Sequence, residues 1–169
     1  MSFSSAKILY VVNEPYFFVS HRLPLACAAL REGYEVHVAA PDDNIWAPLH
    51  FHTVQFFEEQ GIIFHNIPLS RRGLNVFQEI TTLCSLYQLY KHLKPQIVHH
   101  ITAKAILYGG ISARLAKITA SVAAFPGLGH YFTHYGLFSR FMRLVLMKGY
   151  RFVLEHPNSW AIFQNPDDL

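Results

Sequence analysis

The sequence predicts an α/β fold in which a parallel sheet is covered by helices on both faces. Short runs rich in β-branched and aromatic residues alternate with longer helical patterns along the chain, and this alternation is typical of parallel sheets. The helix-stopping residues Gly33, Gly61 and Pro95 stand before the second, third and fourth short runs. With 169 residues, no repeat and no low-complexity linker, the chain is expected to be one domain over residues 1–169.

Predicted strands and helices alternate along the chain. The strands are expected at Lys7–Val12, Tyr34–Ala40, Ile62–Ile67, Gln96–His100, Ser121–Phe125 and Trp160–Gln164. The helices are expected at Val19–Glu32, Leu49–Gln60, Val76–Leu93, Ala103–Lys117 and Phe138–Glu155. This order describes a Rossmann-like half, which is the fold class that the sequence predicts.

The last residues read as the start of a further helix. Asn165 would be the N-cap and Pro166 the first helical residue, while Asp167 and Asp168 suit the positive end of the helix dipole. Because so short a helix is not stable alone, we expect the chain to be the first portion of a longer polypeptide, or to be continued by another chain. A short capping turn is the alternative interpretation.

The composition predicts an apolar surface that needs a partner. Hydrophobic residues make up 51% of the chain and charged residues 15%, whereas soluble domains average about 25% charged residues. The longest charge-free stretch, Ile118–Ser139, contains Pro126 together with glycines and histidines, so it does not read as a membrane-spanning helix. The apolar surplus therefore indicates an interface.

The amino end predicts a cytoplasmic location. Lys7 is followed by only five apolar residues, Ile8–Val12, fewer than the roughly 7 to 15 of a signal-peptide core. In that compartment Cys27 and Cys84, both in apolar and helix-like surroundings, are expected to be reduced, buried thiols. The net charge of +3 is accompanied by no long run of Lys or Arg, so nucleic acid is not an expected partner.

Ligands of such a sheet bind beyond the carboxyl ends of its strands, so the loops there are candidate sites. The first of these loops begins with Asn13 and Glu14. Neither GxGxxG nor GxxxxGK[ST] occurs anywhere in the chain, which disfavours nicotinamide and ATP chemistry, and no cofactor is expected. Further on, His21 and Arg22 open a helix and would suit an anion; ordinary surface residues are the alternative.

Two further loops carry basic groups to the same edge. Arg71 and Arg72 follow the third strand, and their guanidinium groups match phosphate oxygens; a solvated basic turn is the alternative. The fourth strand ends in His99 and His100, with Lys104 shortly after. Neither histidine has a second histidine at the HxxxH or HExxH spacing of zinc sites, so no metal is expected. A strand-tip histidine can act as a general base, although a structural histidine is the commoner explanation.

The loop after the fifth strand is rich in glycine. It contains Gly127, Leu128, Gly129, His130 and Tyr131. Glycines at this place allow tight turning and close approach of the backbone to a ligand. A plain connector explains the same residues, so the pattern alone does not decide.

The last long helix mixes cations with apolar residues on one side. At about 100° per residue this side carries Arg140, Arg143, Lys148 and Arg151, and it also carries Leu144, Met147 and Leu154. Such a face suits an anionic membrane surface. A partner domain over the apolar residues, or plain core packing on the other side of the helix, are the alternatives.

Taken together, these segments resemble the amino-terminal domain of the retaining glycosyltransferases of family 4, which have the GT-B fold of two Rossmann-like halves. The resemblance covers essentially the whole chain and is carried by KILYVVNEPYFFVSHRLPLA, GYEVHVAAP, PLSRRGLN, PQIVHHITAKAILYGGISARLAK, AFPGLGHYF and IFQNPDD. It is closest to the branch that builds lipopolysaccharide, capsule or other glycans on polyprenyl-diphosphate lipids.

The resemblance implies an acceptor-binding half whose carboxyl-terminal, donor-binding domain is absent from this chain. It implies that His99 or His100 lies near the acceptor hydroxyl, with Arg22, Arg71 and Arg72 near phosphate or sugar groups and Gly127–Tyr131 along the cleft. Many relatives read HxHTPK after the fourth strand, and Ile101 occupies the place of the second histidine. The complete enzyme would use a nucleotide sugar and a lipid-linked glycan acceptor, and this half alone would be inactive.

Two other functions remain open. One is a non-catalytic membrane-associated subunit that recruits a separately encoded catalytic half through its apolar surface. The other is half of a nucleotide-sugar epimerase, which has a similar architecture. The length of the native gene product separates a truncated enzyme from an adaptor, and nucleotide binding by this chain would favour the epimerase.

Overall fold

The computed structural model describes residues 5–42, 53–70, 75–125 and 137–164, except for the side chains of residues 137–143 and 145. Its strands are β1 (Lys7–Val12), β2 (Glu35–Ala40), β3 (Ile63–Asn66), β4 (Ile97–Ile101), β5 (Ala120–Phe125) and β6 (Ser159–Phe163). Its helices are α1 (Pro15–His21), α2 (Leu23–Arg31), α3 (Thr53–Glu59), α4 (Val76–Leu93), the π-helical turn η2 (Ala105–Gly109), α5 (Gly110–Ala116) and α6 (Leu137–Leu154).

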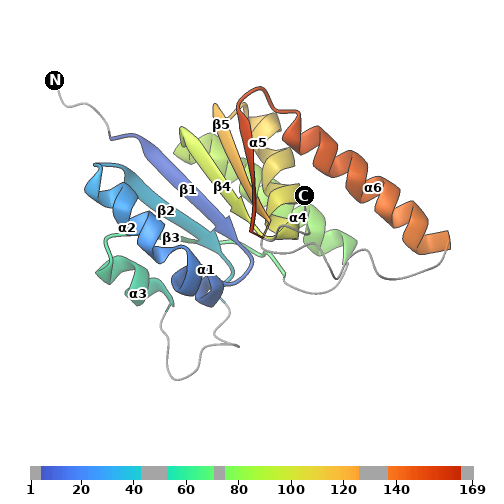
Figure 1. Ribbon diagram of the computed structural model, residues 1–169. Coiled ribbons are helices and arrows are strands. Elements are labelled where there is room, and N and C mark those ends of the chain that lie inside the picture. Colours follow the sequence, from blue (N-terminus) through green and yellow to red (C-terminus); the bar gives the residue numbers. More distant parts are fainter. Residues whose placement is uncertain (1–4, 43–52, 71–74, 126–136, 165–169) are drawn as a thin grey trace.

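The strands form one parallel sheet in the order β3-β2-β1-β4-β5-β6 (Figure 1). The chain runs outward from β1 to β3, returns to place β4 beside β1, and then runs outward again to β6. Tyr10 of β1 is in register with His99 of β4, and Val12 with Ile101. The direction of strand order therefore reverses between β1 and β4, and the predicted Rossmann-like fold is confirmed.

Helices α1, α2 and α3 cover one face of the sheet. Phe18, Ala26 and Phe57 bring these three helices into one buried cluster with strand residues that include Tyr10 and Val38. Alternate strand residues point to opposite faces, so this cluster takes every second residue of β1 and β2. We call α1–α3 the first helical layer.

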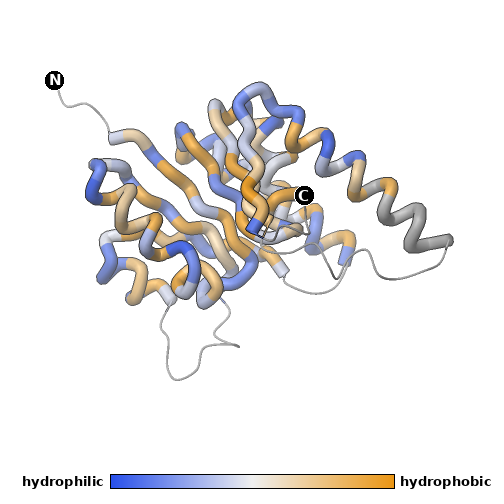
Figure 2. The backbone as a smooth tube through the Cα atoms, viewed as in Figure 1, coloured by the Kyte–Doolittle hydropathy of each residue, from blue (hydrophilic) through white to orange (hydrophobic). Residues whose placement is uncertain are grey.

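Helices α4, η2, α5 and α6 cover the opposite face, and we call them the second helical layer. Leu86 and Tyr90 of α4 pack with Leu9 and Val98 of the sheet. At the β5 end, the core cluster on this face includes Val153 of α6. Figure 2 shows that hydrophobic residues are concentrated along the strands, between the two layers.

The segment expected as one helix, Val19–Glu32, is two helices, so that prediction was wrong. The chain enters α1 at Pro15, and α1 ends at His21. Arg22 has φ −127° and stands between the helices, and Pro24 is one of the first residues of α2. Proline has no amide hydrogen and suits a helix start better than a helix interior, which explains the break.

The helix expected over Ala103–Lys117 begins instead with the wider turn η2 before α5. Gly109 lies where the two meet, against His100. A Cβ at this position would lie 2.2 Å from His100 Cδ2 and 3.1 Å from the Tyr90 hydroxyl. The contact therefore depends on the absence of a side chain at Gly109.

The expectation that both thiols are buried was wrong. Cys84 is exposed, Cys27 is half-buried, and both are free. Cys84 lies on the side of α4 away from the core residues Leu86 and Tyr90, which explains its exposure. None of the described helices combines the length and hydropathy that crossing a bilayer requires.

Candidate functional site

The carboxyl ends of β1 and β4 lie side by side at the reversal of strand order, where α/β sheets bind ligands. Asn13 and Glu14 follow β1, and both are half-buried. Thr102 follows β4, and its amide donates a hydrogen bond to the carbonyl of Ala124 in β5. This edge is therefore the candidate site, and its polar groups decide what it can bind.

Arg22 brings a permanent positive charge to this site from the junction of α1 and α2. Its Nη1 donates to the His21 carbonyl over 3.2 Å. With the Gln164 amide oriented so that its oxygen faces the guanidinium, Nη1 also donates to that oxygen over 3.0 Å. The Nε of Arg22 is buried and has no hydrogen-bond partner among the described residues. Burial lowers the pKa of this guanidinium, but the group stays charged at neutral pH.

His99 is a buried, neutral imidazole on the same face of the sheet. Its ring centroid lies 5.3 Å from that of Tyr10, and the residue is only 6% exposed. Burial lowers the pKa of His99 to about 4, with a smaller contribution from the positive charge of Arg22. Its Nε2 has no hydrogen-bond partner among the described residues. A neutral imidazole can accept a hydrogen bond or a proton from a hydroxyl group.

Thr102 adds backbone strain at the same edge. Its φ is +81°, a left-handed conformation that is unfavourable for a β-branched residue. Its Oγ1 is also buried without a partner among the described residues. Strained residues and unsatisfied buried polar atoms are rare and gather at functional sites. Arg22, His99 and Thr102 each supply one such atom, which makes them the strongest candidates in the site.

His100 points to the other face of the sheet, as expected from strand alternation. It is fully buried, and its Nε2 lies 2.9 Å from the Tyr90 hydroxyl of α4. Its Nδ1 lies 3.4 Å from the Ser121 hydroxyl. Burial lowers the pKa of His100 to about 3, and the neighbouring His99 contributes less. Both ring nitrogens have partners inside the domain, so the structure gives His100 a packing role and no route to solvent.

Lys104 is also held on the side of the second helical layer. Its Nζ donates to Glu79 Oε1 over 2.6 Å, and the two side chains are 12% and 13% exposed. His21 lies on the surface, where it stacks on Phe17 with centroids 4.4 Å apart. The structure therefore keeps His21 beside Arg22 in the chain but leaves its ring exposed.

Several of the other predicted site residues lie outside the described part of the chain. These are Arg71, Arg72, Gly127, Leu128, Gly129, His130 and Tyr131, together with the side chains of Arg140 and Arg143. The expected helix start at Asn165–Asp168 also lies outside it. Lys148 and Arg151 are exposed on α6, and Arg151 pairs with Glu155 over 2.7 Å.

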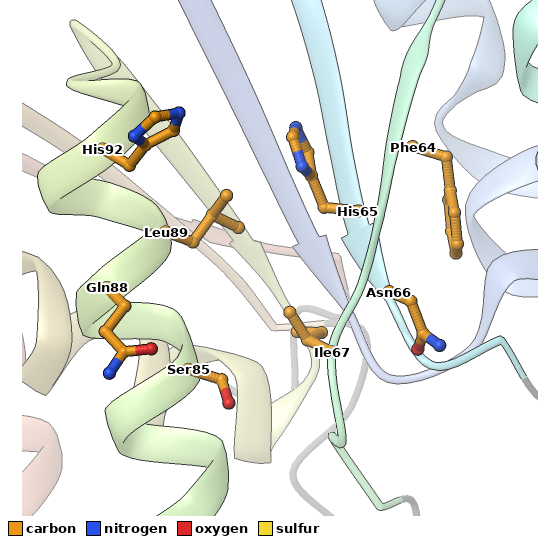
Figure 3. Close-up of a pocket in the computed structure, with 8 residues that line it drawn as sticks. All are labelled: Phe64, His65, Asn66, Ile67, Ser85, Gln88, Leu89 and His92. Atoms are coloured by element: carbon orange, nitrogen blue, oxygen red, sulfur yellow. The ribbon is translucent and has the colours of Figure 1, made fainter.

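A second polar feature lies at the β3 edge of the sheet, away from the strand tips. Figure 3 shows a pocket between β3 and α4, with His65 on one wall and His92 on the other. Its volume is about 480 Å³. His37 Nδ1 lies 3.0 Å from His65 Nε2, and His37 Nε2 lies 2.8 Å from Glu35 Oε1.

The tautomers of this second feature follow from its partners. The Glu35 carboxylate can only accept, so His37 Nε2 donates to it. Burial lowers the pKa of His37 and takes that of His65 to about 4, so both rings are neutral at pH 7. His65 Nε2 therefore donates to the bare Nδ1 of His37. These hydrogen bonds stabilise the edge strand. Among the described residues, no buried side-chain polar atom without a hydrogen-bond partner lies here to mark a ligand site.

Sequence reasoning missed Tyr10, Thr102 and Gln164 as parts of the carboxyl-edge site. Tyr10 could have been found, because it is a polar aromatic residue in a central strand next to the strand that carries His99. Nothing in the sequence indicates the positive φ of Thr102. The contact between Arg22 and Gln164 joins residues far apart in the chain, so it becomes visible only once the strand order is known.

The sequence matches the family described as Glycosyl transferase 4-like over residues 7–154. No curated protein matches the chain at a significant level. Among solved structures, the fold is similar to that of MurG from Acinetobacter baumannii. The TM-score is 0.52 at 15% identity, and the match covers 86% of this chain and 39% of that one.

Two further solved structures have a similar fold. A glycosyltransferase from Rickettsia africae gives a TM-score of 0.55 at 13% identity, covering 96% of this chain and 44% of that one. A putative UDP-N-acetylglucosamine 2-epimerase from Listeria monocytogenes gives 0.51 at 12% identity, covering 89% and 37%. At such identities the likeness shows the fold alone. The chain spans less than half the length of each of these structures.

Proposed function

The chain belongs to the glycosyl transferase 4-like family, and from this premise we propose that it is the acceptor-binding half of a retaining glycosyltransferase. The complete enzyme would move a sugar from a nucleotide-sugar donor to a glycan acceptor carried on a polyprenyl diphosphate. A carboxyl-terminal domain would bind the donor, and residues 1–169 alone would be inactive. The match of residues 7–154 to the family, and a fold shared with halves of larger chains, support this division.

The observation that carries the proposal is that Arg22 and His99 each hold a buried nitrogen without a hydrogen-bond partner among the described residues, near the switch point of the sheet. A guanidinium with an unsatisfied Nε lies close enough to lower the pKa of the neighbouring imidazole. Arg22 can bind an anionic group of the acceptor, such as a diphosphate oxygen. His99 can hold the acceptor hydroxyl by accepting its hydrogen bond, and can take its proton as the new bond forms.

Further residues have supporting roles in the proposal, and all of them except Thr102 were predicted from the sequence. Asn13, Glu14 and Thr102 would border the acceptor. The resemblance to the family also assigns Arg71, Arg72 and Gly127–Tyr131 to the acceptor, and these residues lie outside the described part of the chain. Closure of the proposed donor domain over this half would bring the reacting atoms together and exclude water. We assign His99 rather than His100 to the acceptor hydroxyl, because both ring nitrogens of His100 already have partners on the opposite face.

The lipid carrier of the proposed acceptor places the protein at the inner face of the cell membrane. Contact with anionic lipid through α6 fits this proposal, since Lys148 and Arg151 are exposed there and Arg140 and Arg143 lie in the same helix. The protein would then be cytoplasmic and peripheral to the membrane.

The test is a transfer assay with the full-length gene product, a labelled nucleotide sugar and a polyprenyl-diphosphate-linked acceptor. We expect label in the lipid product with retained anomeric configuration, and no transfer by residues 1–169 alone. Transfer by the short chain would contradict the division of labour. Release of an epimerised nucleotide sugar without transfer would favour the epimerase alternative, and a native product that ends at Leu169 would favour the adaptor.

A further inference from the structure

Basic and acidic residues are unevenly distributed along the chain. Residues 75–154 contain nine of the 14 Lys and Arg residues but only one of the 11 acidic residues, Glu79. The remainder of the chain holds five basic and ten acidic residues. Residues 75–154 form the whole second helical layer together with β4 and β5. The cations of this segment that are described and exposed are Lys91, Lys94, Lys117, Lys148 and Arg151. The modest overall charge of +3 therefore hides a concentration of positive charge in this layer, which bears on what the layer can bind.

Helix α4 in this layer has an exposed apolar stripe. Its buried side is formed by Thr82, Leu86, Tyr90 and Leu93. At 100° per residue Val76, Ile80 and Tyr87 lie close together on one flank of this buried side, and Phe77 lies opposite it. These four residues are 68%, 52%, 38% and 84% exposed, respectively. We call these four residues the α4 stripe. A soluble monomer seldom exposes so many large apolar side chains on a single helix.

The acidic residue of α4 does not interrupt this stripe. Glu79 is 13% exposed and pairs with Lys104 over 2.6 Å on the inner side of the helix. Lys91 is exposed farther along α4, beyond the stripe. The outward surface of α4 is therefore apolar at its amino-terminal end and basic toward its carboxyl end.

Neighbouring helices extend the same combination of apolar and basic groups. Helix α5 contacts both α4 and α6, and its Leu115 is 62% exposed. On α6, Leu144 and Met147 are 52% and 57% exposed. Exposed cations of this layer include Lys117 at the end of α5 and Lys148 on α6. Exposed apolar side chains therefore occur on all three helices of this layer, and exposed cations occur with them.

We propose that the outward surface of α4, α5 and α6 docks on an anionic bilayer, with the α4 stripe entering the boundary between headgroups and acyl chains. This proposal deepens the proposed function, since it names the element that would hold the enzyme at its lipid-linked acceptor. Lysine and arginine side chains of the layer pair with lipid phosphates, and their stems lie along the apolar surface. Burial of the stripe supplies the part of the binding that salt does not screen.

Charge favours a bilayer over a second copy of the chain as the occupant. Two such faces packed together would bring the exposed cations of one copy, such as Lys91, Lys117 and Lys148, against the same cations of the other, while Glu79 is already paired with Lys104 on the inner side. Like charges across an interface cost several kcal/mol. An anionic lipid surface instead offers the opposite sign over the whole area, with an apolar interior beneath it.

The test is co-sedimentation of the full-length protein with vesicles of phosphatidylcholine alone, or of phosphatidylcholine with phosphatidylglycerol. We expect binding to the anionic vesicles, weakened but not abolished by salt. The double variant Phe77→Asp with Ile80→Asp should weaken that binding by about tenfold or more. Leu25→Asp is the matched control, because Leu25 is 49% exposed on α2 in the first helical layer, and it should bind like the wild type.

Three results would overturn the proposal. They are wild-type protein that stays in solution with both vesicle types, a double variant that binds like the wild type, and a double variant that changes only the oligomeric mass. Circular dichroism of each variant would check that it is folded. Transfer to a detergent-solubilised acceptor separates this proposal from the proposed function. A variant that no longer binds vesicles but still transfers sugar supports the docking surface. Wild-type protein that binds vesicles without transferring sugar contradicts the proposed transferase function and leaves the docking surface standing.

Discussion

The rings of Tyr10 and His99 lie on the same face of two adjacent parallel strands, with their centroids 5.3 Å apart. This contact buries the imidazole next to the Arg22 guanidinium and keeps it neutral. Burial also raises the pKa of Tyr10 to about 12, so the phenol is uncharged as well. Arg22 is therefore the charged group of this cluster, and His99 is its acceptor of hydrogen bonds.

We predict that His99→Gln in the full-length enzyme lowers the turnover number by about 10²-fold or more, because an amide cannot take a proton from the acceptor hydroxyl. Steady-state transfer assays measure this. Tyr10→Phe is the matched control: it keeps the ring contact with His99 and should stay within a few-fold of the wild-type rate. A His99→Gln variant with wild-type turnover would remove His99 from the chemistry.

Acid should destabilise the domain through its buried histidines. The folded-state pKa is about 4 for His65 and His99 and about 3 for His100, whereas an unfolded histidine titrates near 6.5. Between these values the unfolded chain binds more protons, so stability is complete above about pH 6.5 and falls as the pH drops toward 4. Each group contributes up to about 1.4 kcal/mol per pH unit.

Urea unfolding at several values between pH 7 and pH 4.5 tests this pH dependence. His99→Asn should show a shallower loss of stability toward low pH than the wild type, because one titrating group has gone. Equal slopes for the two proteins would mean that His99 titrates normally in the folded state.

Gly109→Ala should destabilise the fold by about 1–3 kcal/mol, the range for overpacking a core. The added Cβ would lie 2.2 Å from His100 Cδ2, and His100 is held by Tyr90 and Ser121. Gly149→Ala is the matched control, because among the described residues its Cβ would meet the flexible end of the Leu107 side chain alone, at 2.6 Å. Denaturant midpoints measure both, and equal stabilities of the two variants would show that His100 can move aside.

Lys104→Met should cost about 3 kcal/mol or more of stability, since it leaves the Glu79 carboxylate nearly buried without its cation. Glu79 Oε2 already has no hydrogen-bond partner among the described residues. Adding Glu79→Leu to Lys104→Met should restore most of the loss, because it removes the unpaired charge. A double-mutant cycle by urea unfolding checks this, and additive losses would show that the pair is not coupled.

The strands of the sheet could be predicted from the sequence, because the periodicity of hydrophobic residues and the residues that stop helices are local signals. Gly33 and Gly61, with φ of +85° and +73°, do end the helices before β2 and β3. The bounds of the six described strands lie within one residue of their predicted bounds. The break at Arg22 was missed because apolar residues continue on both sides of it. The exposure of Cys84 was missed because α4 is apolar on its outer side as well as its inner side.

The candidate site was only partly predictable. Alternation along β4 correctly separates His99 from His100, but only the packing shows that His100 is enclosed by Tyr90 and Ser121 while the Nε2 of His99 has no partner among the described residues. The pairing of Lys104 with Glu79 likewise depends on how α4 sits against η2. Tertiary contacts of this kind leave no periodic trace in a sequence.

The most direct test of the acceptor-binding role is a comparison of Michaelis constants for Arg22→Gln in the full-length enzyme. Hydrogen bonds to charged groups contribute about 1.5–3 kcal/mol. We therefore predict that the KM for the polyprenyl-diphosphate-linked acceptor rises by at least about tenfold, while the KM for the nucleotide sugar is unchanged. An unchanged acceptor KM, or a rise confined to the nucleotide sugar, would contradict the assignment of this half to the acceptor.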